Sequence, residues 1–186
     1  NLADFYKQKP EEAEDYAVRL TEGIQKYESV EFISEQPEYT KDDLRLIADN
    51  WKRYFDKYEG GTGSAPKFPQ PNNWQLLMRY AHLMQDDGVA KQVKLTLHKM
   101  AYGGIYDHVG GGFARYSVDG RWHVPHFEKM LYDNAQLISL YAEANTWQPD
   151  ALYEQVVDEI IKFSTRELAS PELGFYSALD ADSEGV

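Results

Sequence analysis

Apolar side chains recur at spacings of three and four residues through most of this 186-residue sequence. This period is typical of amphipathic α-helices that bury one face, whereas a half-buried strand alternates every second residue. The periodic segments run approximately over residues 13–27, 44–55, 76–84, 89–100, 127–141 and 152–163. Only residues 29–34, with the sequence SVEFIS, have the character of a short strand. The sequence therefore predicts an all-α protein of about six helices.

The start of the fifth helix is predicted from a proline. Pro125 suits a first helical turn, because its missing N–H is not needed there and its φ angle is already helical. This start would place His126 and Glu128 in the first turn and turn Phe127 toward the core. Negative charge is favoured in that turn by the helix dipole.

Short and long connections alternate between the predicted helices. The short ones lie near residues 36–39, 85–88 and 146–150. The long ones are glycine-rich and lie at residues 58–73, from residue 103 onward, and at 169–185. Such an alternation predicts about three antiparallel helical hairpins with all long loops at one end. We expect them to form an arc of an α/α toroid whose central cavity is rimmed by these loops.

Composition excludes several classes of protein. A net charge of −12 argues against a nucleic-acid partner, which needs clustered Lys and Arg. No apolar run approaches the roughly 18 residues of a membrane span, and the absence of cysteine excludes disulfides and thiolate metal sites. A cytoplasmic location is expected. The chain starts without methionine and stops after a glycine-rich turn, so we expect residues 1–186 to be a partial domain of a longer protein.

Three stretches of the sequence together resemble a known family. They are GSAPKFP near residue 63, GGIYDHVGGGFARYSVDGRWHVPHFEKMLYDNAQL from residue 103, and GFYSALDADSEG from residue 174. These stretches are similar to the thioredoxin-domain-containing family of spermatogenesis-associated protein 20 and its bacterial relatives. The similarity is scattered from about residue 60 to the end of the chain.

The resemblance implies an architecture. Family members carry an N-terminal thioredoxin-like domain followed by an (α/α)6-barrel related to six-hairpin glycosidases and N-acylglucosamine 2-epimerases. This chain would then hold about half of that barrel, with the thioredoxin-like domain and the remaining hairpins outside it. It contains no CxxC motif, so no redox chemistry is assigned to it.

The long central loop supplies candidates for catalysis. In the epimerase-like barrels that the family resembles, histidines that face the cavity act as acid and base beside a sugar carbonyl. By that analogy His123 or His126 is the candidate base, with Arg115 polarising a carbonyl or holding a hydroxyl group. The loop also supplies Asp107 and Glu128 as candidate catalytic acids. The histidines and Arg115 could instead hold the glycine loop against the fifth helix by hydrogen bonds and an ion pair.

Further residues are candidates for binding a substrate. A sugar site needs aromatic faces for the rings, and acids or cations for the hydroxyl groups. These requirements are met by His108, Arg115, Tyr116, Trp122, Lys129, Asp133, Asp180 and Asp182. Lys129 and Asp133 are also expected to pair, because four residues separate them on a helix. Val124-Pro125 interrupts any helix between His123 and His126, so no metal site is predicted, and no cofactor is indicated.

Three functions stay open at this point. The first is a carbohydrate-binding or sugar-modifying domain with epimerase-like acid/base chemistry. The second is a non-catalytic scaffold or metabolite-binding module that works with a thioredoxin-like domain. The third is a glycoside hydrolase, which needs two carboxylates roughly 5–10 Å apart, such as Asp107 or Glu128 with Asp180 or Asp182. A partial barrel should expose apolar flanks, so we also expect packing against its other domains or a second copy.

Overall fold

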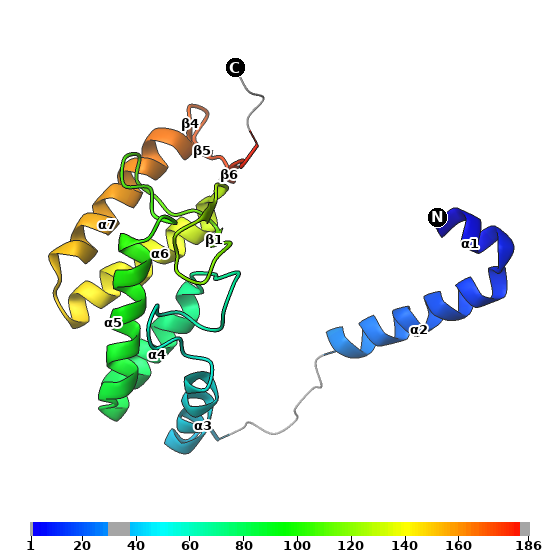
Figure 1. The fold of residues 1–186 in the computed structure, drawn as a ribbon, viewed down its shortest axis with the longest axis horizontal. Coiled ribbons are helices and arrows are strands. Elements are labelled where there is room, and N and C mark those ends of the chain that lie inside the picture. Colours follow the sequence, from blue (N-terminus) through cyan, green and yellow to red (C-terminus); the bar gives the residue numbers. More distant parts are fainter. Residues whose placement is uncertain (1, 30–37, 183–186) are drawn as a thin grey trace. The chain divides into compact units, whose positions relative to one another are not determined.

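The protein is described by a computed structural model that covers residues 2–29 and 38–182 (Figure 1). Its chain divides into two compact units, Asn1–Tyr39 and Thr40–Val186. Most of the predicted strand at 29–34 lies outside the described residues. No helix within the described ranges has the length and apolar content needed to cross a membrane.

The first unit consists of helices α1 (Leu2–Gln8) and α2 (Pro10–Glu28). Proline at the first position of α2 and the acids that follow it suit a helix start. The helix predicted at 13–27 is therefore confirmed. In α2, all of whose residues are described, no side chain is buried within the unit.

The larger unit begins with helix α3 (Lys41–Lys52). A capping box starts it, because the Thr40 hydroxyl accepts from the Asp43 N–H while the Asp43 carboxylate accepts from the Thr40 N–H. Four more α-helices and a π-helical turn follow: α4 (Pro71–Met84), α5 (Asp87–Tyr102), α6 (Leu131–Trp147), α7 (Ala151–Phe163) and η1 (Ser164–Leu168).

Two helical hairpins form the body of this unit. Helix α4 packs against α5, α6 packs against α7, and α4 also packs against α6. Their facing sides make one apolar core, which includes Trp74, Leu77, Val93, Leu97, Leu137, Tyr141, Val156 and Ile160. The second and third predicted hairpins are thus confirmed. A pairing of α2 with α3 stays a prediction, since the two units are described separately.

Short strands join the long loops to one another. The strands are β1 (Tyr116–Ser117), β2 (Pro125–His126), β3 (Lys129–Met130), β4 (Ala169–Ser170), β5 (Gly174–Phe175) and β6 (Ala178–Leu179). They pair antiparallel as β1–β2, β3–β6 and β4–β5.

These pairings bring the three long loops together. The β3–β6 pair connects the loop after α5 to the loop after α7, and a bridge between Lys67 and Ser117 connects the loop before α4 to β1. In Figure 1, β1 and β6 both lie away from the short turns of the two hairpins. The prediction that all long loops meet at one end is confirmed.

The fifth helix starts later than its sequence predicts. Pro125 and His126 form β2, opposite β1, and α6 begins only at Leu131. His126 and Glu128 are therefore not in a first helical turn. Phe127, expected in the core, is 72% exposed. Pairing of residues 125–126 and 129–130 with distant strands keeps this segment extended and overrides the local helical pattern.

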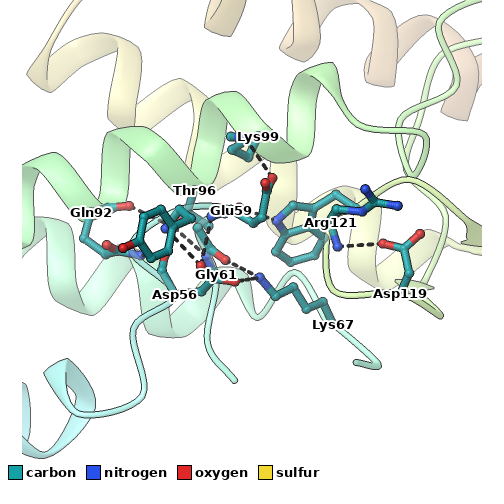
Figure 2. Close-up of polar contacts among 12 residues, drawn as sticks. Asp56, Glu59, Gly61, Lys67, Gln92, Thr96, Lys99, Asp119 and Arg121 are labelled. Atoms are coloured by element: carbon teal, nitrogen blue, oxygen red, sulfur yellow. Dashed lines mark hydrogen bonds and ion pairs between the residues drawn. The ribbon is translucent and has the colours of Figure 1, made fainter. Parts of the chain in front are cut away.

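A buried lysine fixes the first long loop, as Figure 2 shows. The Lys67 side chain is 0% exposed, and its ammonium donates to Asp56 Oδ2 at 2.5 Å and to the Gly60 carbonyl at 2.7 Å. The Trp122 ring lies 5.5 Å from the same nitrogen. A buried charge is tolerated only when it is paired and hydrogen-bonded, so this network dictates the path of the loop.

The same loop is bonded to helix α5 and to the second loop. The Gly61 N–H donates to the Thr96 hydroxyl at 2.9 Å, and the indole N–H of Trp122 donates to the Glu59 carbonyl at 2.8 Å. Gly61 has a φ of +74°, and a Cβ there would lie 2.6 Å from the Trp122 ring. Glycine is required at this position for both reasons.

We predict that Lys67→Met destabilises the protein by about 3 kcal/mol, because Asp56 would remain partly buried without its cation. Urea unfolding measures the change. The matched control is Lys57→Met, since Lys57 is an exposed lysine in the same loop, and its variant should stay within about 0.5 kcal/mol of wild type. Equal unfolding midpoints for the two variants would contradict this account.

Candidate functional site

A cavity of about 390 Å³ lies where the starts of α4 and α6 meet the long loops. We call it the loop-end cavity. Among the residues that line it are Phe68, Gln70, Asn72, Asn73, Arg115, Tyr132, Asp133 and Gln136. Amides, a guanidinium, a carboxyl group and aromatic rings therefore face one space, which is the mixture that a polar organic ligand needs.

The start of α6 is held firmly against the second loop. Asn134 is fully buried, and its amide accepts from the Phe113 N–H at 2.7 Å and donates to the Phe113 carbonyl at 3.1 Å. This double hydrogen bond fixes the first turn of α6, from which Tyr132 and Asp133 reach the cavity. Arg115 follows Phe113 by two residues, so the same contact also positions the guanidinium.

Arg115 and Glu128 form an ion pair at the border of the cavity. Their side chains are 3.0 Å apart, and the Arg115 N–H also donates to the Glu128 carbonyl at 2.8 Å. The fold thus brings these two predicted site residues together, and the Glu128 carboxylate is paired with the guanidinium. Glu128 therefore orients the Arg115 side chain.

Asp133 is the acid among the described residues that line the cavity. It is half-buried, and its Oδ2 has no hydrogen-bond partner among the described residues. Burial raises the pKa of Asp133 to about 6; Arg115 opposes this shift and Glu128 adds to it. A carboxyl group with such a pKa can both hold and release a proton near neutral pH, as general acid/base chemistry requires.

A stack of three rings lies beside the cavity. Phe68 lies over Tyr116 with ring centroids 4.8 Å apart, and Tyr116 stacks on His126 at 4.7 Å. The β1–β2 register sets Tyr116 opposite His126. The buried Nδ1 of His126 has no partner among the described residues. His126 does not line the cavity itself; Tyr116 lies between it and Phe68, which does.

Asp107, predicted as a catalytic acid, belongs to a separate ion pair. Burial acts to raise its pKa, but hydrogen bonds from the Gly110 and Val109 N–H groups and from Lys129 outweigh burial and lower the pKa to about 2. An acid with this pKa is fully ionised at neutral pH and has no proton to donate. The contacts of Asp107 with the Val109 and Gly110 N–H groups and with Lys129 hold the glycine loop in its conformation.

The predicted pair of Lys129 and Asp133 is wrong. The Lys129 ammonium donates instead to Asp107 at 2.7 Å and to the Gly111 carbonyl at 2.9 Å, and it lies 4.5 Å from the Phe163 ring. Lys129 lies on β3 rather than on a helix, so the four-residue spacing does not bring it to Asp133.

Trp122 does not contact a substrate, contrary to its prediction. The side chain is 0% exposed, because it packs on Gly61 and covers Lys67. An indole that is completely covered by protein cannot stack on a sugar ring. Its φ of +63°, unusual outside glycine, shows how strongly the surrounding contacts fix it.

The other two predicted histidines are exposed, and like His126 they are not among the residues that line the loop-end cavity. His108 is exposed; one of its ring nitrogens lies 3.0 Å from the Gly103 carbonyl. His123 is exposed as well, and its backbone N–H donates to Asp119. Their proposed roles stay predictions.

The acids of the third loop come near the second loop through strand pairing. Lys129 pairs with Leu179 in the β3–β6 register, so the next position along sets Asp180 opposite Glu128. Asp180 also accepts from the Asp182 N–H at 3.4 Å. Among the described residues, no group of three or more histidines and acids is arranged to hold a metal ion.

Sequence reasoning missed much of the cavity lining. Asn72, Asn73 and Gln136 were not among the predicted site residues, and neither were Phe68 and Tyr132. A signal was present, because Pro71 at the first position of α4 places the two asparagines in an exposed first turn. Nothing local indicates that this turn faces the start of α6.

Comparison with known proteins gives the relatives of this chain. It is 50% identical over 133 residues to spermatogenesis-associated protein 20 of Mus musculus and of Homo sapiens. This chain is a homologue of a segment of spermatogenesis-associated protein 20. The match covers 69% of this chain and 17% of each relative, so the chain spans only a small part of those proteins. An uncharacterized protein of Caenorhabditis elegans is 37% identical over 161 residues, which is 80% of this chain and 22% of that protein. No family model matches the chain.

Solved structures with the same fold are sugar epimerases. A sugar epimerase from a ruminal bacterium superposes with a TM-score of 0.66 at 14% identity, covering 76% of this chain and 40% of that one. The cellobiose 2-epimerase of Spirochaeta thermophila gives 0.66 at 16% identity, with 76% and 39% covered. These matches confirm the predicted fold class, an arc of an (α/α)6 barrel.

We predict that stability depends on pH through Asp133. Its folded pKa of about 6 lies above the ordinary 3.8, so the folded state binds the proton more tightly. The free energy of unfolding should therefore fall as pH rises from about 4 to above 6, by no more than about 2 kcal/mol for a half-exposed group.

Urea unfolding of wild type and Asp133→Asn at several pH values between 4 and 7 measures this dependence. As pH rises across this window, the free energy of unfolding of Asp133→Asn should increase relative to that of wild type. Asp158→Asn is the control, because Asp158 is an exposed acid on α7. If the difference between Asp133→Asn and wild type is constant with pH, the raised pKa is wrong.

Proposed function

We propose that the loop-end cavity binds a sugar and moves a proton at the carbon beside its carbonyl group, as an epimerase or isomerase does. The observation that carries this proposal is Asp133, a half-buried carboxyl group with a raised pKa beside Arg115 in a ligand-sized cavity. The fold shared with sugar epimerases supports the class of substrate.

Each step of such a reaction has a candidate group. The ionised Asp133 removes the proton, and the guanidinium of Arg115 stabilises the negative charge that develops on the carbonyl oxygen. Epimerisation returns the proton on the opposite face of the carbon, which requires a second proton carrier. The imidazole of His126 is the candidate for that role.

Other lining residues suit the binding of a sugar. The amides of Asn72, Asn73 and Gln136 can both donate to and accept from hydroxyl groups. The exposed face of Phe68 offers an apolar surface for the C–H groups of a sugar ring. Arg115 is the cation among them, and its pairing with Glu128 leaves further guanidinium N–H groups for the ligand.

The test is exchange of hydrogen with solvent. In D2O, the chain should introduce deuterium beside the carbonyl of a substrate aldose, which NMR detects at C2. Asp133→Asn should reduce the rate at least about a hundredfold, because it removes a proton-transfer group. The rate should rise with pH as Asp133 ionises near pH 6.

Asp158→Asn is again the control and should exchange at the wild-type rate. Exchange that is unchanged in Asp133→Asn would contradict the role of this residue. Absence of exchange with every aldose and ketose tried would contradict the proposed reaction.

A glycoside hydrolase is supported by a different observation. The β3–β6 register places the backbone of Asp180 opposite Glu128, so two carboxyl groups come from neighbouring positions. The ion pair of Glu128 with Arg115 speaks against it as a free nucleophile. The same NMR assay separates the two reactions, because a hydrolase would release monosaccharide from cellobiose without deuterium at C2.

A scaffold is supported by the first unit. Within this unit Tyr16, Leu20 and Ile24 of α2 are exposed, and Tyr16 and Leu20 border, with α1, an apolar hollow of about 660 Å³. Exposed apolar patches of this kind are typical of surfaces that bind protein. The partner would be a second copy or another domain of a longer protein, such as the predicted thioredoxin-like domain.

We predict that association of the chain with itself depends on this face. Light scattering after gel filtration should give the mass of a dimer for wild type and of a monomer for Leu20→Asp/Ile24→Asp, because two buried charges oppose association. Thr21→Asp, an exposed substitution on the same helix, should remain dimeric. A monomeric wild type would exclude a second copy as the occupant.

A further inference from the structure

A second cavity lies next to the loop-end cavity. Its volume is about 330 Å³, and it is lined by Asn50, Trp51, Tyr54, Thr62, Gly63 and Gln70. We call it the Trp51 cavity. Gln70 lines both cavities, so the two spaces are neighbours.

The Trp51 cavity is built from structured backbone. Asn50 and Trp51 come from the last turn of α3, and the Gly63 N–H donates to the Tyr54 carbonyl at 2.9 Å. Thr62 forms a β-bridge with Phe55, so the chain between residues 55 and 62 is closed into a loop by backbone contacts. The two aromatic rings therefore stand on a fixed frame.

Gln70 has features that suit a residue between two parts of a ligand. Its φ of +46° is unusual for a residue other than glycine, and such strain persists only where the surroundings impose it. Its Oε1 accepts from the Thr62 hydroxyl at 3.1 Å. No described residue accepts from its Nε2, which leaves two donor hydrogens for a ligand on either side.

The chemistry of the Trp51 cavity differs from that of its neighbour. It offers two aromatic rings, two amides and a hydroxyl group, and its lining contains no charged side chain. Aromatic faces with neutral hydrogen-bonding groups suit an uncharged sugar ring and offer nothing to a phosphate or a carboxylate. The proton-transfer groups lie in the loop-end cavity.

We propose that the two cavities are adjacent subsites for one oligosaccharide of at least two sugar units. The unit that reacts lies in the loop-end cavity beside Arg115 and Asp133. The neighbouring neutral unit lies on Trp51 and Tyr54, with Gln70 bonded between them. This inference rests on the proposed function, because it assumes that the loop-end cavity takes a sugar.

Calorimetric binding of matched sugars tests the proposal. The probes are glucose with cellobiose, mannose with mannobiose, and N-acetylglucosamine with chitobiose. For at least one pair, the disaccharide should bind the full chain about tenfold or more tightly than the monosaccharide. Tyr54→Ala should remove this gain and leave binding of the monosaccharide within about twofold of wild type.

Two further variants sharpen the result. Tyr102→Ala is the matched control. Tyr102 is about as exposed as Tyr54 (70% and 66%), but it lies at the end of α5 and does not line the Trp51 cavity. This variant should keep the full gain for the disaccharide. Trp51→Ala should also remove the gain for the disaccharide. Trp51 packs against the core, so its removal can unfold the protein, and the test therefore rests on Tyr54→Ala.

The outcomes separate this inference from the proposed function. Equal affinity for both members of every pair would overturn the second subsite and leave the loop-end cavity as a sugar site. A gain that survives Tyr54→Ala would overturn the placement of the second unit. If none of the six sugars binds, both proposals fail together. Tighter binding of a disaccharide by a wild-type chain that exchanges no deuterium would contradict the proposed reaction and leave the two subsites supported.

Discussion

The architecture of the loop end depends on one buried charge. Lys67 lies in a place that water does not reach, so its ammonium must be satisfied by Asp56 and the Gly60 carbonyl. These two hydrogen bonds fold the first loop back on itself. The Trp122 ring then lies over the Lys67 ammonium. The backbone of Lys67 also pairs with Ser117 through two hydrogen bonds of 2.8 Å, so the position of β1 follows from the same residue.

The candidate site is a consequence of that arrangement. With β1 fixed, Tyr116 is set against His126, and the neighbouring Arg115 reaches the cavity. The start of α6 is tied to the same loop by Asn134. Residues from three separate parts of the chain therefore meet with defined geometry, although each lies at the end of a helix or in a loop. A rigid frame of this kind is what proton transfer requires.

Two acids near this loop show how surroundings assign chemistry to identical side chains. Asp107 receives backbone N–H groups and an ammonium, and its pKa falls to about 2. Burial raises the pKa of Asp133 to about 6, and Arg115 only partly opposes the shift. The first is a permanently charged structural group, and the second can exchange a proton at neutral pH. In sequence both are aspartates close to glycines, histidines and arginines, and only their distant neighbours distinguish them.

The sequence by itself determined the periodic helices, the second and third hairpins and the clustering of the long loops, because apolar periodicity and turn composition are local properties. Its motifs also indicated the family and, through it, the fold. Only the tertiary structure decided that α6 begins at Leu131, that Trp122 is buried, and that the pKa of Asp133 is raised while that of Asp107 is lowered. Each of these depends on a partner far away in the chain, such as β6 for β3 or Gly61 for Trp122. Local patterns carry no information about which distant segment supplies such a partner.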